Sequence, residues 1–131
     1  MDGRLSLFAP LAFALSAPAG GHSAEAAIPL EEWRALTLGK TVHYSIGGRP
    51  AGREYYPEAG DFAVFLTPDG MCVEGPWAFD EGRYCFLYGE ALQCFAHLRR
   101  GDDIVSRPEA GGDEQIVARI SKDEPISCDA N

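Results

Sequence analysis

Apolar and polar positions alternate with a period of two along most of the chain after residue 40. In residues 41–46, Val42, Tyr44 and Ile46 alternate with polar side chains, and a Gly-Gly-Arg-Pro stretch then breaks the run. Short β-prone runs separated by turn-forming residues, at a spacing of about 8–12 residues, predict an antiparallel meander. We therefore expect a mainly β domain, either a small barrel or a strongly bent sheet. The eight predicted strands cover residues 41–46, 53–56, 62–66, 71–79, 83–88, 91–98, 104–107 and 115–120.

One short helix is predicted ahead of the strands, over residues 29–36. Pro29 stands at a first helical position, two acids follow in the first turn, and Gly39 comes after the last turn. Helical spacing places the apolar side chains of Leu30, Trp33 and Leu36 on one face. This face would pack against the sheet.

Four cysteines, Cys72, Cys85, Cys94 and Cys128, allow three disulfide pairings. Gly89 opens a two-residue turn of the type II′ kind between two β-prone runs. Counting outward from this turn places Cys85 opposite Cys94, at a non-hydrogen-bonded pair where Cα atoms approach to about 4.5 Å. The hairpin register therefore predicts the Cys85–Cys94 bridge, which leaves Cys72 to pair with Cys128.

The N-terminal segment has the layout of a secretory signal peptide. An uncharged apolar stretch covers residues 5–15, Arg4 precedes it, and small residues follow it. Small residues at −3 and −1 allow cleavage after Ala26 or Ala19, with Ala24 as a further option. We expect residues 1–26 to be a signal peptide and residues 27–131 to be a single β-rich domain, periplasmic or secreted. An even number of cysteines fits such an oxidising compartment.

The length of the chain limits the size of the domain, and its charge limits the kinds of partner that it can bind. The chain has 131 residues, enough for one ordinary core. Asp and Glu number 20 against 11 Lys and Arg, a net charge of −9, which disfavours nucleic acids and anionic membranes as partners. No apolar run approaches the roughly 20 residues of a membrane span. We therefore expect a folded, acidic protein with no membrane span.

The predicted hairpin of residues 83–98 is apolar on both faces. One face carries Leu87 and Leu92 together with the two cysteines. A hairpin with one face in water would alternate apolar and polar side chains. The other face is therefore either core packed around the tryptophans or an exposed surface that binds a partner. We name it the aromatic strip: Tyr84, Phe86, Tyr88, Phe95 and His97.

No complete catalytic or metal-binding signature occurs in the sequence. His43 and His97 are the histidines of the predicted mature chain, and no Gly-x-Ser-x-Gly motif accompanies them. The cysteines lack Cys-x-x-Cys spacing, and the paired acids lie at turns without the spacing of a Ca²⁺ loop. We therefore predict no metal and no cofactor. Enzyme activity is not predicted, and the alternative is a hydrolase that uses His97 or His43 with a nearby carboxylate.

One segment resembles small exported proteins of Gram-negative bacteria, which are largely of unknown function. It combines a Gly-x-Trp motif with a pair of cysteines that are each followed by an aromatic residue. The resemblance implies a β-rich periplasmic domain, and it names neither a ligand nor a catalytic residue. The motifs are Asp69-Gly70-Met71-Cys72, Gly75-Pro76-Trp77, Gly82-Arg83-Tyr84-Cys85-Phe86 and Cys94-Phe95.

These features together predict an exported, non-catalytic binding or protein-interaction module, of which a small envelope inhibitor is one form. Its partner would be a periplasmic protein or an apolar ligand bound through the aromatic strip.

Overall fold

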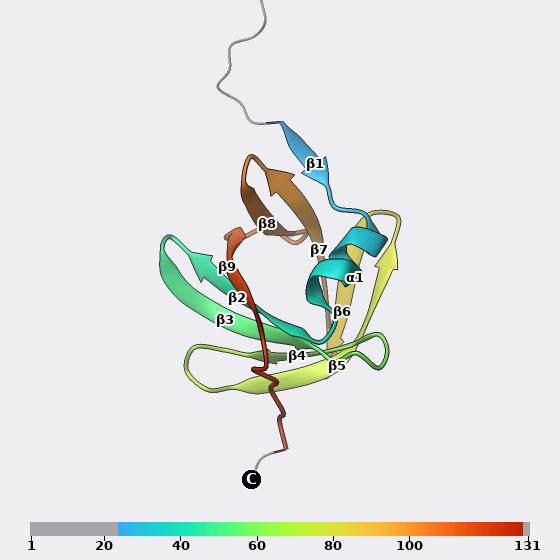
Figure 1. The fold of residues 1–131 in the computed structure, drawn as a ribbon, viewed down its shortest axis with the longest axis vertical. Helices are drawn as coiled ribbons and strands as arrows, with labels where there is room; N and C mark the ends of the chain where they lie inside the picture. Colours follow the sequence, from blue (N-terminus) through green and yellow to red (C-terminus); the bar gives the residue numbers. More distant parts are fainter. Residues whose placement is uncertain (1–23, 130–131) are drawn as a thin grey trace, which may run out of the picture.

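The computed structural model describes residues 24–129, so most of the predicted signal peptide lies outside the described residues. One short helix and nine strands make up the fold, in which each predicted strand has a counterpart (Figure 1). In order along the chain they are β1 (Glu25–Ala27), α1 (Leu30–Thr37), β2 (Lys40–Ile46), β3 (Arg49–Tyr56), β4 (Phe62–Leu66), β5 (Cys72–Asp80), β6 (Arg83–Tyr88), β7 (Ala91–Arg100), β8 (Asp103–Pro108) and β9 (Gln115–Lys122).

Strands β2 to β9 form a closed antiparallel barrel. Each strand pairs with the next one along the chain, and β9 returns to pair with β2. The predicted β-rich meander is therefore confirmed, in its barrel form. Closure leaves no free edge among these eight strands. The backbone groups of β2 and β9 therefore have hydrogen-bond partners on both sides, as those of the middle strands do. In the described part of the chain, no helix is both long and apolar enough to span a bilayer.

The first hairpin begins earlier than the sequence indicates. Arg49 and Pro50 were expected to lie in a break, but they belong to β3. Gly47 and Gly48 both have positive φ, 59° and 82°, as a two-residue hairpin turn of type I′ requires. The proline is accommodated because the register shifts beside it, between Tyr44 and the next residue of β2.

The short strand β1 was not predicted. It pairs with the second half of β7, on the side where β6 pairs with the first half. The Glu25 carboxylate accepts hydrogen bonds from Arg100 and Arg107, and Glu114 accepts from the same two arginines. This network of four charges joins β1 to β7, β8 and the residue before β9.

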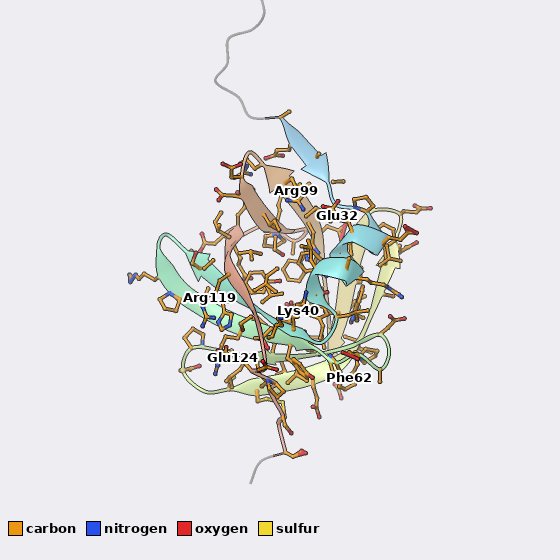
Figure 2. All side chains as sticks on the ribbon, in the orientation of Figure 1. Glu32, Lys40, Phe62, Arg99, Arg119 and Glu124 are labelled. Carbon is orange, nitrogen blue, oxygen red and sulfur yellow. A yellow bond between two sulfur atoms is a disulfide. The ribbon has the colours of Figure 1, made fainter. Side chains whose placement is uncertain are left out.

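Helix α1 covers one end of the barrel and lies across part of the ring of strands in Figure 1. The predicted apolar face is confirmed, because Trp33 is fully buried and Leu30 and Leu36 pack against the core. Beside this apolar face, Glu32 accepts hydrogen bonds from Arg99 of β7 (Figure 2). A second ion pair joins Arg34 of the helix to Asp61, just before β4, over 2.9 Å. The helix is thus fixed to the barrel by one buried indole and two ion pairs.

Two disulfides close the fold. Cys85 and Cys94 face each other across the β6–β7 hairpin with their Cα atoms 3.9 Å apart, closer than the predicted 4.5 Å. Cys72, at the start of β5, is bonded to Cys128 in the segment after β9, with a Cα separation of 5.5 Å. This is the pairing that the hairpin register predicts. Such bridges are typical of proteins from oxidising compartments.

Candidate ligand site in the barrel interior

The aromatic strip faces the interior of the barrel. Tyr84, Phe86 and His97 are almost completely buried, while Tyr88 and Phe95 are half-buried. The opposite face of the same hairpin is the outer surface, where Leu87 is 40% and Leu92 is 65% exposed. Of the two interpretations of the strip, its burial favours an interior surface over an external one.

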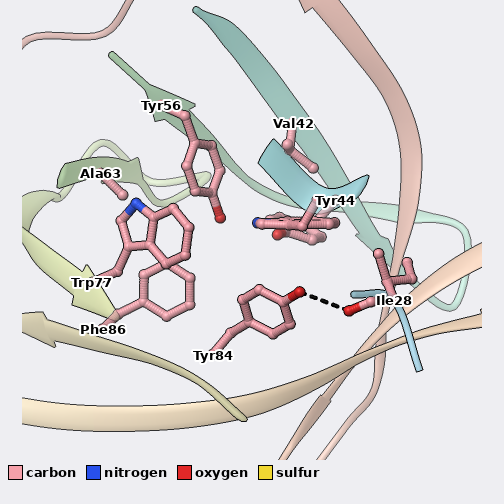
Figure 3. Packing of buried hydrophobic residues seen from close by; sticks show 9 residues of the cluster. Ile28, Val42, Tyr44, Tyr56, Ala63, Trp77, Tyr84 and Phe86 are labelled. Carbon is pink, nitrogen blue, oxygen red and sulfur yellow. Dashed lines mark hydrogen bonds between the residues drawn. The ribbon is translucent and has the colours of Figure 1, made fainter. Parts of the chain in front are cut away.

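A layer of aromatic rings separates α1 from the rest of the interior. The Trp33 ring lies 6.0 Å from Tyr56 and 5.8 Å from Tyr84, and Trp77 lies 5.8 Å from Tyr56. The Tyr84 hydroxyl donates a hydrogen bond to the carbonyl of Ile28 over 2.7 Å, which anchors the segment leading into the helix (Figure 3). This layer forms the floor of the remaining space, because Tyr56 and Tyr84 pack against Phe86 and His97, which line that space.

Above this floor lies a cavity of about 310 Å³. Every barrel strand from β2 to β9 contributes to its wall, and the exposed residues Ala91 and Gln93 mark its mouth beside the β6–β7 turn. Binding cavities for small molecules have this mixture of aromatic walls and few polar groups. The lining residues are Tyr44, Glu54, Phe65, Thr67, Val73, Phe86, Tyr88, Ala91, Gln93, Phe95, His97, Ser106 and Gln115.

A buried carboxylate on β3 collects three tyrosine hydroxyls. Tyr44 and Tyr56 donate to Oε1 of Glu54 over 3.1 and 2.8 Å, and Tyr88 donates to Oε2 over 2.5 Å. Glu54 is 5% exposed, and its three partners come from β2, β3 and β6. We call these four residues the tyrosine–glutamate cluster. It places a hydrogen-bonded acidic group in the wall of an otherwise largely apolar cavity.

Burial raises the pKa of Glu54 above its usual value, and the three hydroxyl donors oppose that rise by stabilising the carboxylate. Burial beside the same carboxylate holds the pKa of Tyr44 and Tyr56 well above the usual range, so both hydroxyls keep their protons as donors. The sequence analysis missed this cluster. The available signal was Glu54 on the same strand face as Tyr56, in a run short enough for either face to be the inner one.

His97 supplies a second polar atom to the site. Its ring stacks on Trp33 and Tyr84, at centroid distances of 3.9 and 4.2 Å, and Nδ1 is buried with no hydrogen-bond partner among the described residues. Burial lowers the pKa of His97 to about 3, so the ring is neutral near pH 7. A buried polar atom without a partner is uncommon, and it belongs here to a residue that lines the cavity.

The buried histidine makes stability depend on pH. Its folded pKa lies below the ordinary value of 6.5, so its contribution to stability is complete above pH 6.5 and is lost as pH falls toward about 3. Between pH 7.5 and 5 we expect this contribution to the free energy of unfolding to fall by about 2 kcal/mol. Urea denaturation of the wild type and of His97→Phe at both pH values measures it.

The comparison between the two proteins isolates His97 from the carboxylates. The contribution of Glu54 to stability changes with pH in the opposite direction. Its pKa is raised in the folded protein, so this contribution is present at low pH and is lost as pH rises. Both proteins retain Glu54, so its effect cancels in the difference. An equal pH dependence in the wild type and in His97→Phe would contradict the assignment of a neutral, buried ring.

The second histidine lies outside this cavity, on the β2–β9 side of the barrel. His43 Nε2 is 2.9 Å from Ser121 Oγ and 3.1 Å from Glu124 Oε1, and the serine hydroxyl donates to the same carboxylate over 3.0 Å. Arg119 approaches Glu124 at 3.8 Å (Figure 2). Burial is the main reason that the pKa of His43 is lowered. Serine and carboxylate share one ring nitrogen, whereas a catalytic triad uses both nitrogens.

Metal ligands do not converge in the part of the chain that the structure describes: residues 24–129 contain no group of three or more His, Cys, Asp or Glu side chains that could hold an ion. No family model, curated protein or solved structure matches this chain.

Proposed function

We propose that this chain is an exported, non-catalytic binding protein that holds a small, largely apolar ligand inside its barrel. The observation that supports the proposal is the cavity of about 310 Å³, whose wall includes five Phe and Tyr rings and the buried Glu54 and His97. Its volume lies at the lower end of the range for small-molecule sites, about 300–1,000 Å³. The ligand is therefore expected to be small, of the size of one or two rings.

Burial of the aromatic strip favours a small molecule over a protein partner. A protein interface needs roughly 800 Å² of accessible surface on each partner. Tyr84, Phe86 and His97 expose 2% or less of their surface, so they offer no area to a protein. A small ligand reaches the half-buried members of the strip, Tyr88 and Phe95, through the mouth beside Ala91.

Binding inside the barrel is testable with N-phenyl-1-naphthylamine, an uncharged dye whose fluorescence rises in apolar surroundings. We expect saturable binding of one dye per wild-type chain. Ala91→Trp fills the mouth and should abolish binding, because Ala91 lines the cavity. The matched control is Leu92→Trp, one residue further on β7 and 65% exposed on the outer face, which should bind as the wild type does.

Circular dichroism first establishes that both variants fold. Equal dye binding by folded Ala91→Trp and the wild type would contradict a site inside the barrel. Loss of binding only in Leu92→Trp would instead locate the dye on the outer face of the hairpin.

We further propose that the mature protein is periplasmic or secreted, as the two disulfides and the resemblance to exported Gram-negative proteins suggest. Processing after Ala26 would remove Glu25 from the ion-pair network, whereas processing after Ala19 or Ala24 would retain it. Mass spectrometry of exported material should give an N-terminus between residues 20 and 27. A cytoplasmic protein that retains Met1 would contradict export.

The second candidate function is the hydrolase, and the contact between Ser121 Oγ and His43 Nε2 is the observation that favours it. Its signature would be turnover of p-nitrophenyl acetate that disappears in Ser121→Ala and persists in Ser127→Ala, an exposed serine further along the tail. The shared ring nitrogen makes this arrangement a weaker basis than the cavity.

A further inference from the structure

The charged groups of the cavity suit a positively charged ligand. Among the described residues that line it, Glu54 is the one carboxylate and none is lysine or arginine. We infer that the ligand is an organic cation, with an ammonium group placed on Glu54 and an apolar body placed against the aromatic rings. This inference rests on the proposed function, because it names the class of molecule that the same cavity would hold.

The tyrosine–glutamate cluster leaves room for one more donor. A carboxylate offers about four acceptor positions, and three tyrosine hydroxyls occupy three of them. Oε1 accepts two of these bonds and Oε2 accepts one, from Tyr88. An ammonium N–H fits the remaining position on Oε2 and supplies the positive charge that a buried carboxylate otherwise lacks.

Aromatic rings continue from the carboxylate along the wall. Phe65 lies 6.4 Å from Tyr44 and 6.4 Å from Tyr88, and Phe86 lies 5.7 Å from Tyr88 and 5.9 Å from Phe95. Five rings are therefore linked by centroid distances of 6.4 Å or less, with Glu54 beside two of them. Ring faces attract cations within about 6 Å, and cages of such rings bind ammonium groups.

Two further features suit a cation. His97 is neutral, so it does not repel positive charge, and its unpaired Nδ1 offers a hydrogen-bonding position to a polar group elsewhere on the ligand. The chain also carries a net charge of −9, which favours the approach of cations from solution.

Three ligands of one shape test the inference: 2-phenylethylammonium, the neutral 2-phenylethanol and the anionic phenylacetate. Calorimetric titration of the wild-type chain near neutral pH should show the ammonium binding roughly tenfold or more tighter than the alcohol, with the acid weakest. Glu54→Gln should bring the ammonium and the alcohol to similar affinities. Glu74→Gln, which changes an exposed acid on the outer face of β5, should leave the tenfold preference intact.

The wild-type series decides even if Glu54→Gln fails to fold. In that case the order of the three affinities in the unaltered chain, with the ammonium tightest, carries the test by itself. If the alcohol or the acid binds as tightly as the ammonium or more tightly, the inference of a cationic ligand is overturned, while the proposed binding function stays intact. Binding of N-phenyl-1-naphthylamine but of none of the three ligands would overturn it in the same way. Absence of binding by all four compounds would contradict the binding function itself.

Discussion

Trp33→Ala is expected to lower the free energy of unfolding by about 3–5 kcal/mol, the range for removing a fully buried large aromatic side chain. The indole is 0% exposed and contacts rings of three different barrel strands, in Tyr56, Tyr84 and His97. Its removal leaves a hole that the closed barrel cannot collapse to fill, because each strand is held on both sides. Urea denaturation followed by far-ultraviolet circular dichroism measures the loss.

Glu31→Ala is the matched control, because Glu31 lies on the exposed side of the same helix. Its effect should stay within about 0.5 kcal/mol. A loss below about 1 kcal/mol in Trp33→Ala would show that α1 is not an integral floor of the barrel, since surface substitutions have effects of that size.

Removal of the Cys72–Cys128 disulfide should be about as costly. In the chain-entropy model, stabilisation grows with the length of the closed loop, and this bridge spans a sequence separation of 56 against 9 for Cys85–Cys94. The corresponding losses are about 4 and about 3 kcal/mol. For a domain with a net stability of about 5–15 kcal/mol, either loss is a large fraction of the total.

Two double variants measure this order, with Cys72 and Cys128 replaced by serine in one and Cys85 and Cys94 in the other. Each serves as the control for the other, because both remove two thiols and one bridge. Urea denaturation should give the larger loss for the pair that closes the longer loop. A larger loss for Cys85 and Cys94 would show that local strain or packing outweighs loop closure here.

Periodicity and turn chemistry predict the strands and one of the bridges because both depend on neighbours in the sequence. The β6–β7 register follows from the turn at Gly89 alone, and that register places Cys85 opposite Cys94. The second bridge then follows by elimination. Likewise, the apolar face of α1 follows from helical spacing within one segment.

Features that depend on barrel closure could not be predicted in this way. The pairing of β9 with β2 encloses the aromatic strip, and without it the strip could equally face a partner. Glu54 meets Tyr88 across a sequence separation of 34, and no local pattern indicates such a contact. β1 was missed because its three residues lie among the small residues that suggest signal cleavage.

The central claim is that the ligand lies inside the barrel, and the most direct test is nuclear magnetic resonance on the dye complex. Intermolecular Overhauser effects from bound N-phenyl-1-naphthylamine should reach the ring protons of Phe86 and Phe95 in the cavity wall. Contacts confined to the methyl groups of Leu87 and Leu92, on the outer face of the same hairpin, would contradict the account.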